Sequence, residues 1–191
     1  MLLACFSPFA MGSFTPAGDK SVPEGFCLSS EEMKLYELIN RYRKERNLPP
    51  IPLSKSLSYV SRLHVIDLSE NPPTGNCNMH SWSKDERWTS CCYTPDHRKS
   101  DCMWNKPREL TNYPGNGYEI AHGSPSASYI ASAEESLAGW KSSSGHNQVI
   151  INKGTWASVK WKAVGVGIYK NYAVVWFGEQ EDPETGLTTC K

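Results

Sequence analysis

The fold is decided by the stretch Ala163-Val164-Gly165-Val166-Gly167-Ile168-Tyr169, which is followed by Lys170-Asn171 and then by residues 172–179, which are apolar up to Glu179. Both apolar halves are rich in β-branched and aromatic residues, and two residues between them match the length of a tight hairpin turn. The stretch therefore predicts an antiparallel hairpin. Gly165 and Gly167 fall on one face of the first strand, which leaves that face flat for close packing of a helix.

Two helices are predicted upstream of the hairpin. The first covers about residues 30–46, because Ser29 and Glu32 have the spacing of a capping box and apolar residues then recur at helical period. The second begins after Ser54 and ends before Pro72-Pro73, since proline cannot continue a helix. Its inward face is formed by Leu57, Val60, His64 and Leu68.

The middle of the chain is irregular. Residues 71–116 are rich in Pro, Gly, Asn and Cys, and they show little periodicity apart from one expected helical turn at 83–88. A loop region of this length is uncommon unless it is functional or cross-linked. A short strand at 117–121 and a third long helix at 126–140 are expected to follow. The inward-facing residues of that helix are Ile130, Ala133, Leu137 and Trp140.

These elements predict an α+β fold in which helices cover a sheet. The chain has 191 residues, enough for one domain with a core and short for two. We expect a single domain over residues 29–191, with a cysteine-rich loop insertion at about 71–116. Residues 1–28 are then a linker or the remnant of an export signal.

The composition argues against several classes of function. Lys plus Arg equals Asp plus Glu at 20 each, so no overall field would attract nucleic acid or an anionic membrane. Hydrophobic residues make up 39% and charged residues 21%, proportions typical of a soluble globular protein. No stretch after the N-terminus is apolar over a length that spans a bilayer. We expect no nucleic-acid partner and no transmembrane segment, and the oligomeric state is left open.

The seven cysteines indicate an oxidising compartment. When Cys5 is set aside, the remaining six suit three disulfides. We expect Cys27 to pair with Cys190, tying the two ends of the chain together, and the other four to pair within residues 77–102. The alternative is a zinc site, but the chain has no Cys-x-x-Cys pair.

The N-terminal residues 1–12 predict export. This segment is apolar and ends in small residues, like the hydrophobic and cleavage regions of a signal peptide that lacks its basic part. Alternatively, Leu2-Leu3-Ala4-Cys5 matches a bacterial lipoprotein signal, which would anchor the protein to a surface through Cys5. Both interpretations place the mature protein outside the cell.

Three short segments each hold one potential metal ligand. They are Asn78-Met79-His80-Ser81-Trp82, Gly117-Tyr118-Glu119-Ile120-Ala121 and Trp140-Lys141-Ser142-Ser143-Ser144-Gly145-His146-Asn147. Two imidazoles and a carboxylate, from His80, His146 and Glu119, are what a zinc ion with an open coordination position accepts. The three residues lie far apart along the chain, so only the fold could bring them together.

The order of these segments resembles that of the CAP superfamily, which comprises cysteine-rich secretory proteins, antigen 5 and pathogenesis-related proteins and is also named after its SCP domain. The resemblance covers about residues 30–179. It rests on the order and spacing of several motifs, none of them specific by itself. The matching segments are 62–68, 79–81, 117–121, 140–147 and 163–167, with Asn152 and Trp176-Phe177-Gly178.

The resemblance implies a three-layer α-β-α sandwich with a solvent cleft, in which two histidines and two glutamates hold zinc or another divalent ion. His80 and His146 match the two histidines. The resemblance also allows a lipid or sterol partner, or an extracellular protein partner. A cleft that holds no metal is the alternative.

This chain departs from the family pattern at both glutamates. In the usual Gly-Glu-Asn-Ile frame, Tyr118 holds the glutamate slot and Glu119 the asparagine slot. A one-residue slip on a strand reverses the face that a side chain takes, so the role of Glu119 as third ligand depends on a bulge that corrects the register. The second glutamate is missing, since Lys141-Ser142-Ser143 follows Trp140. Glu134 is the one substitute that the sequence offers.

The other histidines have structural interpretations. His64 lies on the inward face of the second helix, which favours a buried, hydrogen-bonded role. His122 would face away from Glu119 on a regular strand, and His97 lies in the cysteine-rich loop, where we expect exposure to solvent. The tryptophans of that region are expected to pack around the disulfides, with an apolar groove for a lipid or a glycan as the alternative. They are Trp82, Trp88 and Trp104.

Three functions compete on this sequence. The first is a secreted binding module with a divalent ion at His80 and His146. The second is a metal-assisted hydrolase, for which the chain lacks a His-Glu-x-x-His motif, a Gly-x-Ser-x-Gly elbow and the glutamate that would serve as general base. The third is a cell-surface interaction protein that uses the loop at 71–116, since loops often carry binding residues. We favour the first, which is not an enzyme.

Overall fold

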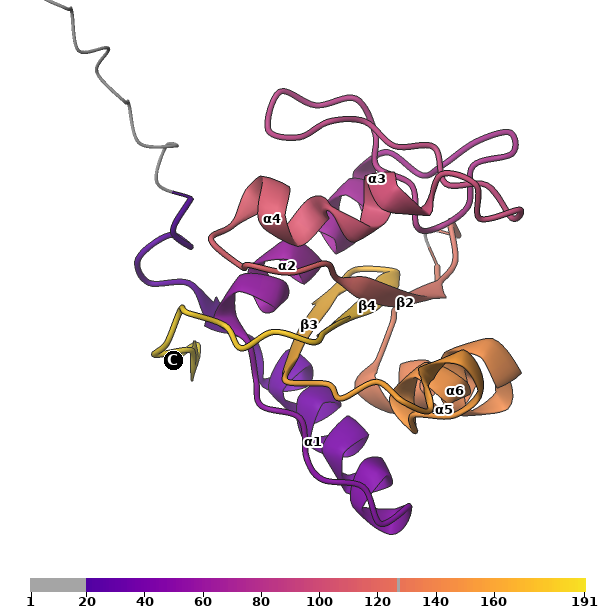
Figure 1. Cartoon of the computed structure of the whole chain (residues 1–191). Helices are drawn as coiled ribbons and strands as arrows, with labels where there is room; N and C mark the ends of the chain where they lie inside the picture. Colours follow the sequence, from indigo (N-terminus) through magenta and orange to yellow (C-terminus); the bar gives the residue numbers. More distant parts are fainter. Residues whose placement is uncertain (1–19, 127) are drawn as a thin grey trace, which may run out of the picture.

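A computed structural model describes residues 20–126 and 128–191 (Figure 1). The expectations for residues 1–12, namely the export signal and a lipidated Cys5, lie outside the described residues. Within the part of the chain that is described, no helix combines the length and the apolar character needed to cross a bilayer.

The predicted hairpin is the centre of an antiparallel sheet. Strand β3 (Ala163–Tyr169) and strand β4 (Tyr172–Gly178) pair along their whole length. Strand β2 (Tyr118–Gly123) pairs with the other side of β4, so the strand order is β2-β4-β3. Strand β4 is therefore central and buried, whereas β2 forms one edge of the sheet. The candidate functional site lies along this edge.

One face of the sheet is covered by α1 (Ser30–Glu45), α5 (Ala133–Ser142) and α6 (Ser144–Ile150) (Figure 1). Helix α1 begins as predicted, because the Ser29 hydroxyl accepts the Glu32 N–H and the Glu32 carboxylate accepts the Ser29 N–H at 2.8 Å. The core on this face includes Leu35, Ile39, Ile120, Leu137, Trp140, Ile150, Val164, Val166 and Val175.

The other face of the sheet is covered by α2 (Lys55–Glu70), which Ser54 caps as predicted. The two glycines of β3 allow this close packing. A Cβ added at Gly165 would lie 2.1 Å from the backbone carbonyl carbon of Leu57, and one at Gly167 would lie 2.7 Å from that of Ser61. Helices on both faces of the sheet confirm the predicted three-layer α-β-α sandwich.

The predicted third helix is wrong in its start. Helix α5 begins at Ala133, and the Ser132 hydroxyl accepts the N–H of Glu135 as its cap. The residues before it are held by the hairpin turn, since Ala131 donates its N–H to the carbonyl of Lys170. Ile130, which we expected to face inward, is 76% exposed. The apolar periodicity of the sequence begins at about residue 126, whereas the helix itself begins at Ala133.

The cysteine-rich region contains two short helices that the sequence did not predict, α3 (Ser100–Trp104) and α4 (Lys106–Leu110). The helical turn expected at 83–88 is wrong, because Asp85 and Trp88 form an antiparallel bridge instead. The region lies over the α2 side of the sheet (Figure 1). A 3₁₀ turn, η1 (Gly154–Trp156), follows α6 on the opposite side.

Three disulfides confirm the expected distribution of cysteines. Cys27 pairs with Cys190, where the short strands β1 (Cys27–Leu28) and β5 (Thr188–Thr189) run side by side. The other four cysteines pair within the loop region as Cys77–Cys92 and Cys91–Cys102. One bridge thus ties the ends of the domain, and two bridges brace the long loop.

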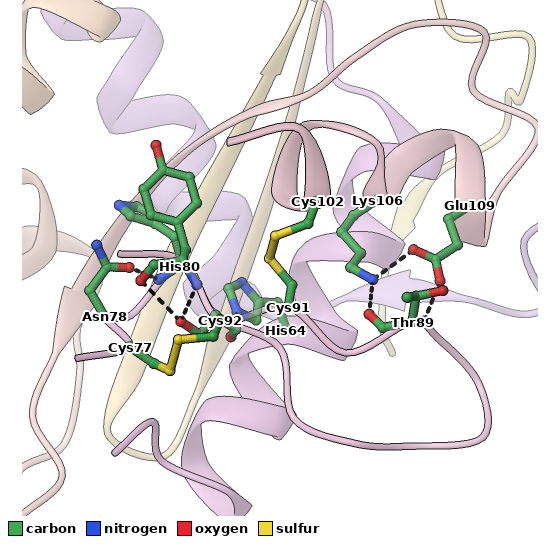
Figure 2. The surroundings of a disulfide bond; sticks show 12 residues. His64, Cys77, Asn78, His80, Thr89, Cys91, Cys92, Cys102, Lys106 and Glu109 are labelled. Carbon is green, nitrogen blue, oxygen red and sulfur yellow. Dashed lines mark hydrogen bonds and ion pairs between the residues drawn. A yellow bond between two sulfur atoms is a disulfide. The ribbon is translucent and has the colours of Figure 1, made fainter. Parts of the chain in front are cut away.

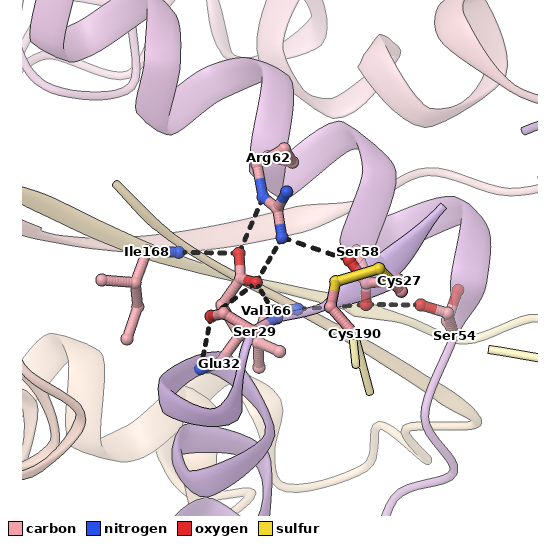
Figure 3. A network of polar contacts seen from close by, with 9 residues as sticks. All are labelled: Cys27, Ser29, Glu32, Ser54, Ser58, Arg62, Val166, Ile168 and Cys190. Atoms are coloured by element: carbon pink, nitrogen blue, oxygen red, sulfur yellow. Dashed lines mark hydrogen bonds and ion pairs between the residues drawn. A yellow bond between two sulfur atoms is a disulfide. The ribbon is translucent and has the colours of Figure 1, made fainter. Parts of the chain in front are cut away.

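A buried ion pair joins the layers. Glu32 of α1 has no solvent exposure, and its carboxylate accepts hydrogen bonds from the Arg62 guanidinium of α2 and from the N–H of Ile168 in β3 (Figure 3). The same carboxylate completes the capping box with Ser29. One side chain therefore links both helical layers to the sheet, because each of its partners comes from a different element.

Candidate functional site: a histidine cleft at the sheet edge

His80 is held on a loop that a disulfide closes. It lies between Cys77 and Cys92, and its N–H donates to the side-chain oxygen of Asn78 at 3.0 Å (Figure 2). The Asn78 N–H in turn donates to the carbonyl of Tyr93 at 2.9 Å. These contacts fix a segment without regular secondary structure, so that the imidazole points toward β2.

Glu119 of β2 binds two imidazoles with its two carboxylate oxygens. Oε1 lies 2.7 Å from Nδ1 of His80, and Oε2 is in hydrogen-bond contact with Nδ1 of His64. The Glu119 residue is 7% exposed and its carboxylate is fully buried. Burial alone would raise the pKa of Glu119, but the adjacent His64 and His80 hold it below its ordinary value. Glu119 is therefore a buried carboxylate anion.

The pairing of β2 explains where Glu119 points. Each residue of β2 from Tyr118 to Gly123 has one partner on β4, so the strand has no bulge. Tyr118 packs in the core on the α1 side, and Glu119 reaches His64 on the α2 side. The one-residue slip relative to the family pattern is thus not corrected, and Glu119 takes the opposite face from Tyr118.

His64 is a buried structural histidine, as predicted. Its Nε2 lies 2.9 Å from the carbonyl oxygen of Ser81, and its ring stacks on Trp82 at a centroid distance of 4.3 Å. Both ring nitrogens face oxygens that can only accept, so both carry a proton and the ring is an imidazolium. Burial alone would lower the pKa of His64, but the Glu119 carboxylate and the Ser81 carbonyl raise it above its ordinary value.

This arrangement fixes the tautomer of His80. Because Nδ1 of His80 faces the Glu119 carboxylate, Nδ1 carries the hydrogen and donates it. In the neutral ring the lone pair then resides on Nε2. Nε2 has no hydrogen-bond partner among the described residues.

The sequence did not predict that His64, Glu119 and His80 form one hydrogen-bonded array. The position of His64 on an apolar helix face indicated that it is buried but did not indicate its partner.

His146 comes from α6, on the other side of the sheet edge. Burial lowers its pKa below the ordinary value, and the neighbouring imidazoles of His80 and His122 lower it further. The ring is therefore neutral at pH 7, and its nitrogens make no hydrogen bond with the described residues. His122 lies on the opposite face of β2 from Glu119, as expected, and its Nε2 lies 2.9 Å from the Tyr129 hydroxyl.

A cavity of about 460 Å³ brings the three predicted site residues together. His80, Glu119 and His146 all line it. Its remaining wall includes four large aromatic side chains, those of Tyr93, Trp104, Tyr118 and Trp156. The cavity can receive residues from both helical layers because β2 is an edge strand and no further strand separates them there.

The structure also shows where His97 and Glu134 lie relative to the cavity. His97 is exposed, as expected, and its Nδ1 lies 2.8 Å from the Tyr93 hydroxyl at the rim of the cavity. Glu134 does not replace the missing glutamate, since it is exposed and pairs with Lys34 at 2.6 Å, away from the cavity.

The donor set fits a divalent ion in part. Within residues 20–126 and 128–191, no group of three or more His, Cys, Asp or Glu side chains is arranged to hold a metal ion. His80 and His146 each present an imidazole nitrogen that has no hydrogen-bond partner among the described residues, and an unprotonated imidazole nitrogen is what binds a metal ion. Both oxygens of Glu119 already accept from imidazoles. The residues present therefore fit a two-histidine site in which Glu119 supports one ligand.

The three-layer sandwich and the two histidines at a cleft beside the edge strand agree with the family that the sequence comparison identifies. The chain belongs to the cysteine-rich secretory protein family, abbreviated CAP, whose family model matches residues 36–177. No curated protein sequence matches the chain significantly.

Solved structures with the same fold include two bacterial proteins. One is an extracellular protein of Bacillus anthracis that contains an SCP domain, with 17% identity and a TM-score of 0.53 over 78% of this chain. This chain spans 40% of the length of that protein. The other is an outer surface protein of Borrelia burgdorferi, with 19% identity and a TM-score of 0.53 over 80% of this chain and 95% of that one. At these identities the likeness shows the fold alone.

Proposed function

We propose that this CAP domain is a secreted binding module whose cleft holds a divalent ion between Nε2 of His80 and the imidazole of His146. Zinc is the ion that we favour. One observation carries the proposal: His80 donates its Nδ1 hydrogen to Glu119, which leaves Nε2 open toward the cavity. A carboxylate behind a histidine is the usual way in which proteins orient and strengthen a metal-binding imidazole.

Glu119 acts in this proposal from behind His80. Its negative charge is balanced by the His64 imidazolium, so the site has no uncompensated buried charge before an ion arrives. A divalent ion held by two protein nitrogens would keep coordination positions free for a ligand in the cleft. A ligand could therefore bind the protein and the ion together.

Three disulfides support export, because such bonds persist in oxidising compartments. Both solved neighbours are described as extracellular or surface proteins. The proposal covers a freely secreted form and a form anchored through Cys5. Measuring the mass of the mature N-terminus distinguishes the two, since an anchored form would begin at Cys5 and carry the added mass of its lipid.

Binding is favoured over hydrolysis by the state of the cleft carboxylate. A general base has to accept a proton from the attacking water, yet both oxygens of Glu119 already accept hydrogen bonds from imidazoles. The half-buried aromatic wall suits a ligand with at least one apolar face, a group that includes lipids, sterols and sugars.

The proposal is tested by titrating zinc into metal-stripped protein by calorimetry. We expect one site per chain in the unaltered protein and its loss in the double variant His80→Ala/His146→Ala. The matched control is Glu134→Gln, which removes an exposed charge outside the cavity and should bind zinc normally. Equal zinc binding by the double variant would overturn the proposal.

A further inference from the structure

We propose that the cleft binds a neutral saccharide, with a pyranose ring stacked on the aromatic wall and hydroxyls bonded to His80 and His146. This inference deepens the proposed function, because it names a ligand class for the same cavity. It does not require the metal ion, so the two proposals can fail separately.

The aromatic wall is built by three segments that the fold brings together. Tyr118 opens β2, Trp104 ends α3, and Trp156 belongs to η1. The Tyr118 ring lies 5.6 Å from the Trp104 ring and 5.0 Å from the Trp156 ring, centroid to centroid, at steep angles. All three are partly exposed and line the cavity. They form one continuous apolar surface.

Further aromatic residues make this surface rigid. Trp161 packs against Tyr118 at 5.6 Å and against Trp156 at 5.4 Å. Trp161 is itself buried, and its indole N–H donates to the carbonyl of Val149 at 2.9 Å. A wall fixed in this way loses little conformational entropy when a ligand stacks on it, which favours affinity.

The shape of the wall distinguishes a saccharide from a quaternary ammonium group. Cages for such cations surround the charge with several ring faces. Here Tyr118 packs edge to face against both Trp104 and Trp156, with centroids 5.0 to 5.6 Å apart, so these rings contact each other and do not surround a central charge. The C–H face of a pyranose ring is apolar and slightly positive, so it complements the negative face of an aromatic ring.

The charge of the cavity favours a neutral ligand. No Lys or Arg is among the described residues that line it, so a phosphate or carboxylate ligand would find no cation to pair with there. The one carboxylate, Glu119, is occupied by His64 and His80. The histidines are then the main polar groups that face a ligand.

The unpaired imidazole nitrogens distinguish a saccharide from an alkyl chain. Nε2 of His80 and the ring nitrogens of His146 have no hydrogen-bond partner among the described residues. An alkyl chain would cover them and leave them unpaired, which costs free energy. A hydroxyl group can both donate and accept, so it can bond either imidazole whichever nitrogen carries the hydrogen.

The test uses the whole chain in the presence of EDTA, with N-acetylchitotriose, cellotriose and maltotriose as probes. Binding is followed by saturation-transfer difference NMR and by tryptophan fluorescence. We expect at least one trisaccharide to bind, and its ring C–H protons to receive the strongest saturation. Replacing a stacking residue, as in Trp104→Ala or Trp156→Ala, should weaken binding roughly tenfold, comparable with losses measured for stacked bases.

Two further variants distinguish the loss of stacking on the aromatic wall from the loss of the fold. Tyr118→Leu keeps an apolar side chain but removes the ring, and Tyr36→Ala removes a half-buried ring outside the cavity. The first should weaken saccharide binding and the second should not. Zinc calorimetry on Trp104→Ala should be unchanged, because the indole of Trp104 supplies no metal ligand, so this variant tests the saccharide proposal alone.

Two results would overturn this inference. One is the absence of binding by all three saccharides, and binding of stearate or of cholesterol in vesicles would then assign the wall to a lipid. The other is saccharide binding that Trp104→Ala, Trp156→Ala and Tyr118→Leu leave unchanged. Failure of zinc binding in the separate titration overturns the metal proposal only.

Discussion

Nδ1 of His80 lies 2.7 Å from Oε1 of Glu119, and this contact joins a disulfide-braced loop to the edge strand of the sheet. His64 holds the other oxygen of Glu119 from α2. The orientation of the cleft imidazole therefore depends on three elements that meet only in the folded domain.

The first prediction concerns Glu119. In Glu119→Gln the carboxylate charge is lost, so His80 is oriented less strongly and the His64 imidazolium loses its counter-ion. We expect zinc affinity to fall by about ten- to a hundredfold, the usual effect of removing a carboxylate behind a metal-binding histidine. Calorimetry measures the affinity, and near-UV circular dichroism verifies the fold. An unchanged affinity would mean that Glu119 does not orient His80.

The second prediction concerns the disulfide that closes the His80 loop. Removing it in Cys77→Ala/Cys92→Ala releases a loop with a sequence separation of 15, which is expected to cost about 3 kcal/mol of unfolding free energy. Zinc affinity should fall as well, because His80 lies inside this loop. Cys27→Ala/Cys190→Ala is the matched control. It should lower the thermal midpoint and leave the zinc affinity of the folded protein unchanged.

The third prediction concerns acid stability at Glu109. Burial alone would raise the pKa of Glu109, but hydrogen bonds from Lys106 and Thr89 hold it below 4.5, its ordinary value (Figure 2). A lowered pKa in the fold means that ionised Glu109 stabilises the protein above pH 4.5 and that this contribution is lost as the pH falls through the folded value. Glu109→Gln should therefore lower stability at pH 7 and flatten its decline in acid, measured by urea unfolding.

Lys106 provides the control for that experiment. It is 1% exposed, donates to Glu109 at 2.6 Å and to the carbonyl of Thr89, and lies over the Trp82 ring at 5.2 Å. Glu109→Gln alone leaves this cation without its carboxylate, whereas Lys106→Met/Glu109→Gln removes both charges. The double variant should be more stable than the single one. The reverse order would show that the ion pair is not what makes the single change costly.

The fourth prediction compares two glycines. In Gly165→Ala the new methyl group would lie 2.1 Å from the Leu57 backbone, which cannot move without shifting α2, so we expect a loss of about 1–3 kcal/mol or more. In Gly145→Ala the new methyl group meets nothing within 4 Å on α6, so the variant should gain up to about 1 kcal/mol from helix propensity. Thermal unfolding of both variants compares them, and equal midpoints would contradict the packing account.

Local sequence patterns determined much of this protein. The capping box at Ser29 and Glu32 placed the start of α1, and two apolar runs separated by Lys170-Asn171 placed the hairpin of β3 and β4. These signals work because helix caps and tight turns depend on residues a few positions apart. Closeness in sequence also indicated that the four cysteines within residues 77–102 pair among themselves, whereas the particular pairs came from the structure.

The sequence predicted which residues line the candidate site, but it did not predict how they contact one another. Motif order identified His80, His146 and Glu119, and the structure places all three around one cavity. The role of Glu119 could not be deduced, because it depends on the register of β2 against β4 and on a partner 55 residues away, His64. A one-residue change in that register would turn Glu119 to the other face.

The tertiary structure alone decided how the cleft is built. The sequence determined the elements, their caps and the residues able to bind metal, because those properties reside in short segments. It did not determine that β2 is the edge strand, that Tyr118 joins Trp104 and Trp156, or that a buried imidazolium balances Glu119. Such features arise from contacts between distant segments, whose energies depend on packing and desolvation that exist only once the layers have closed.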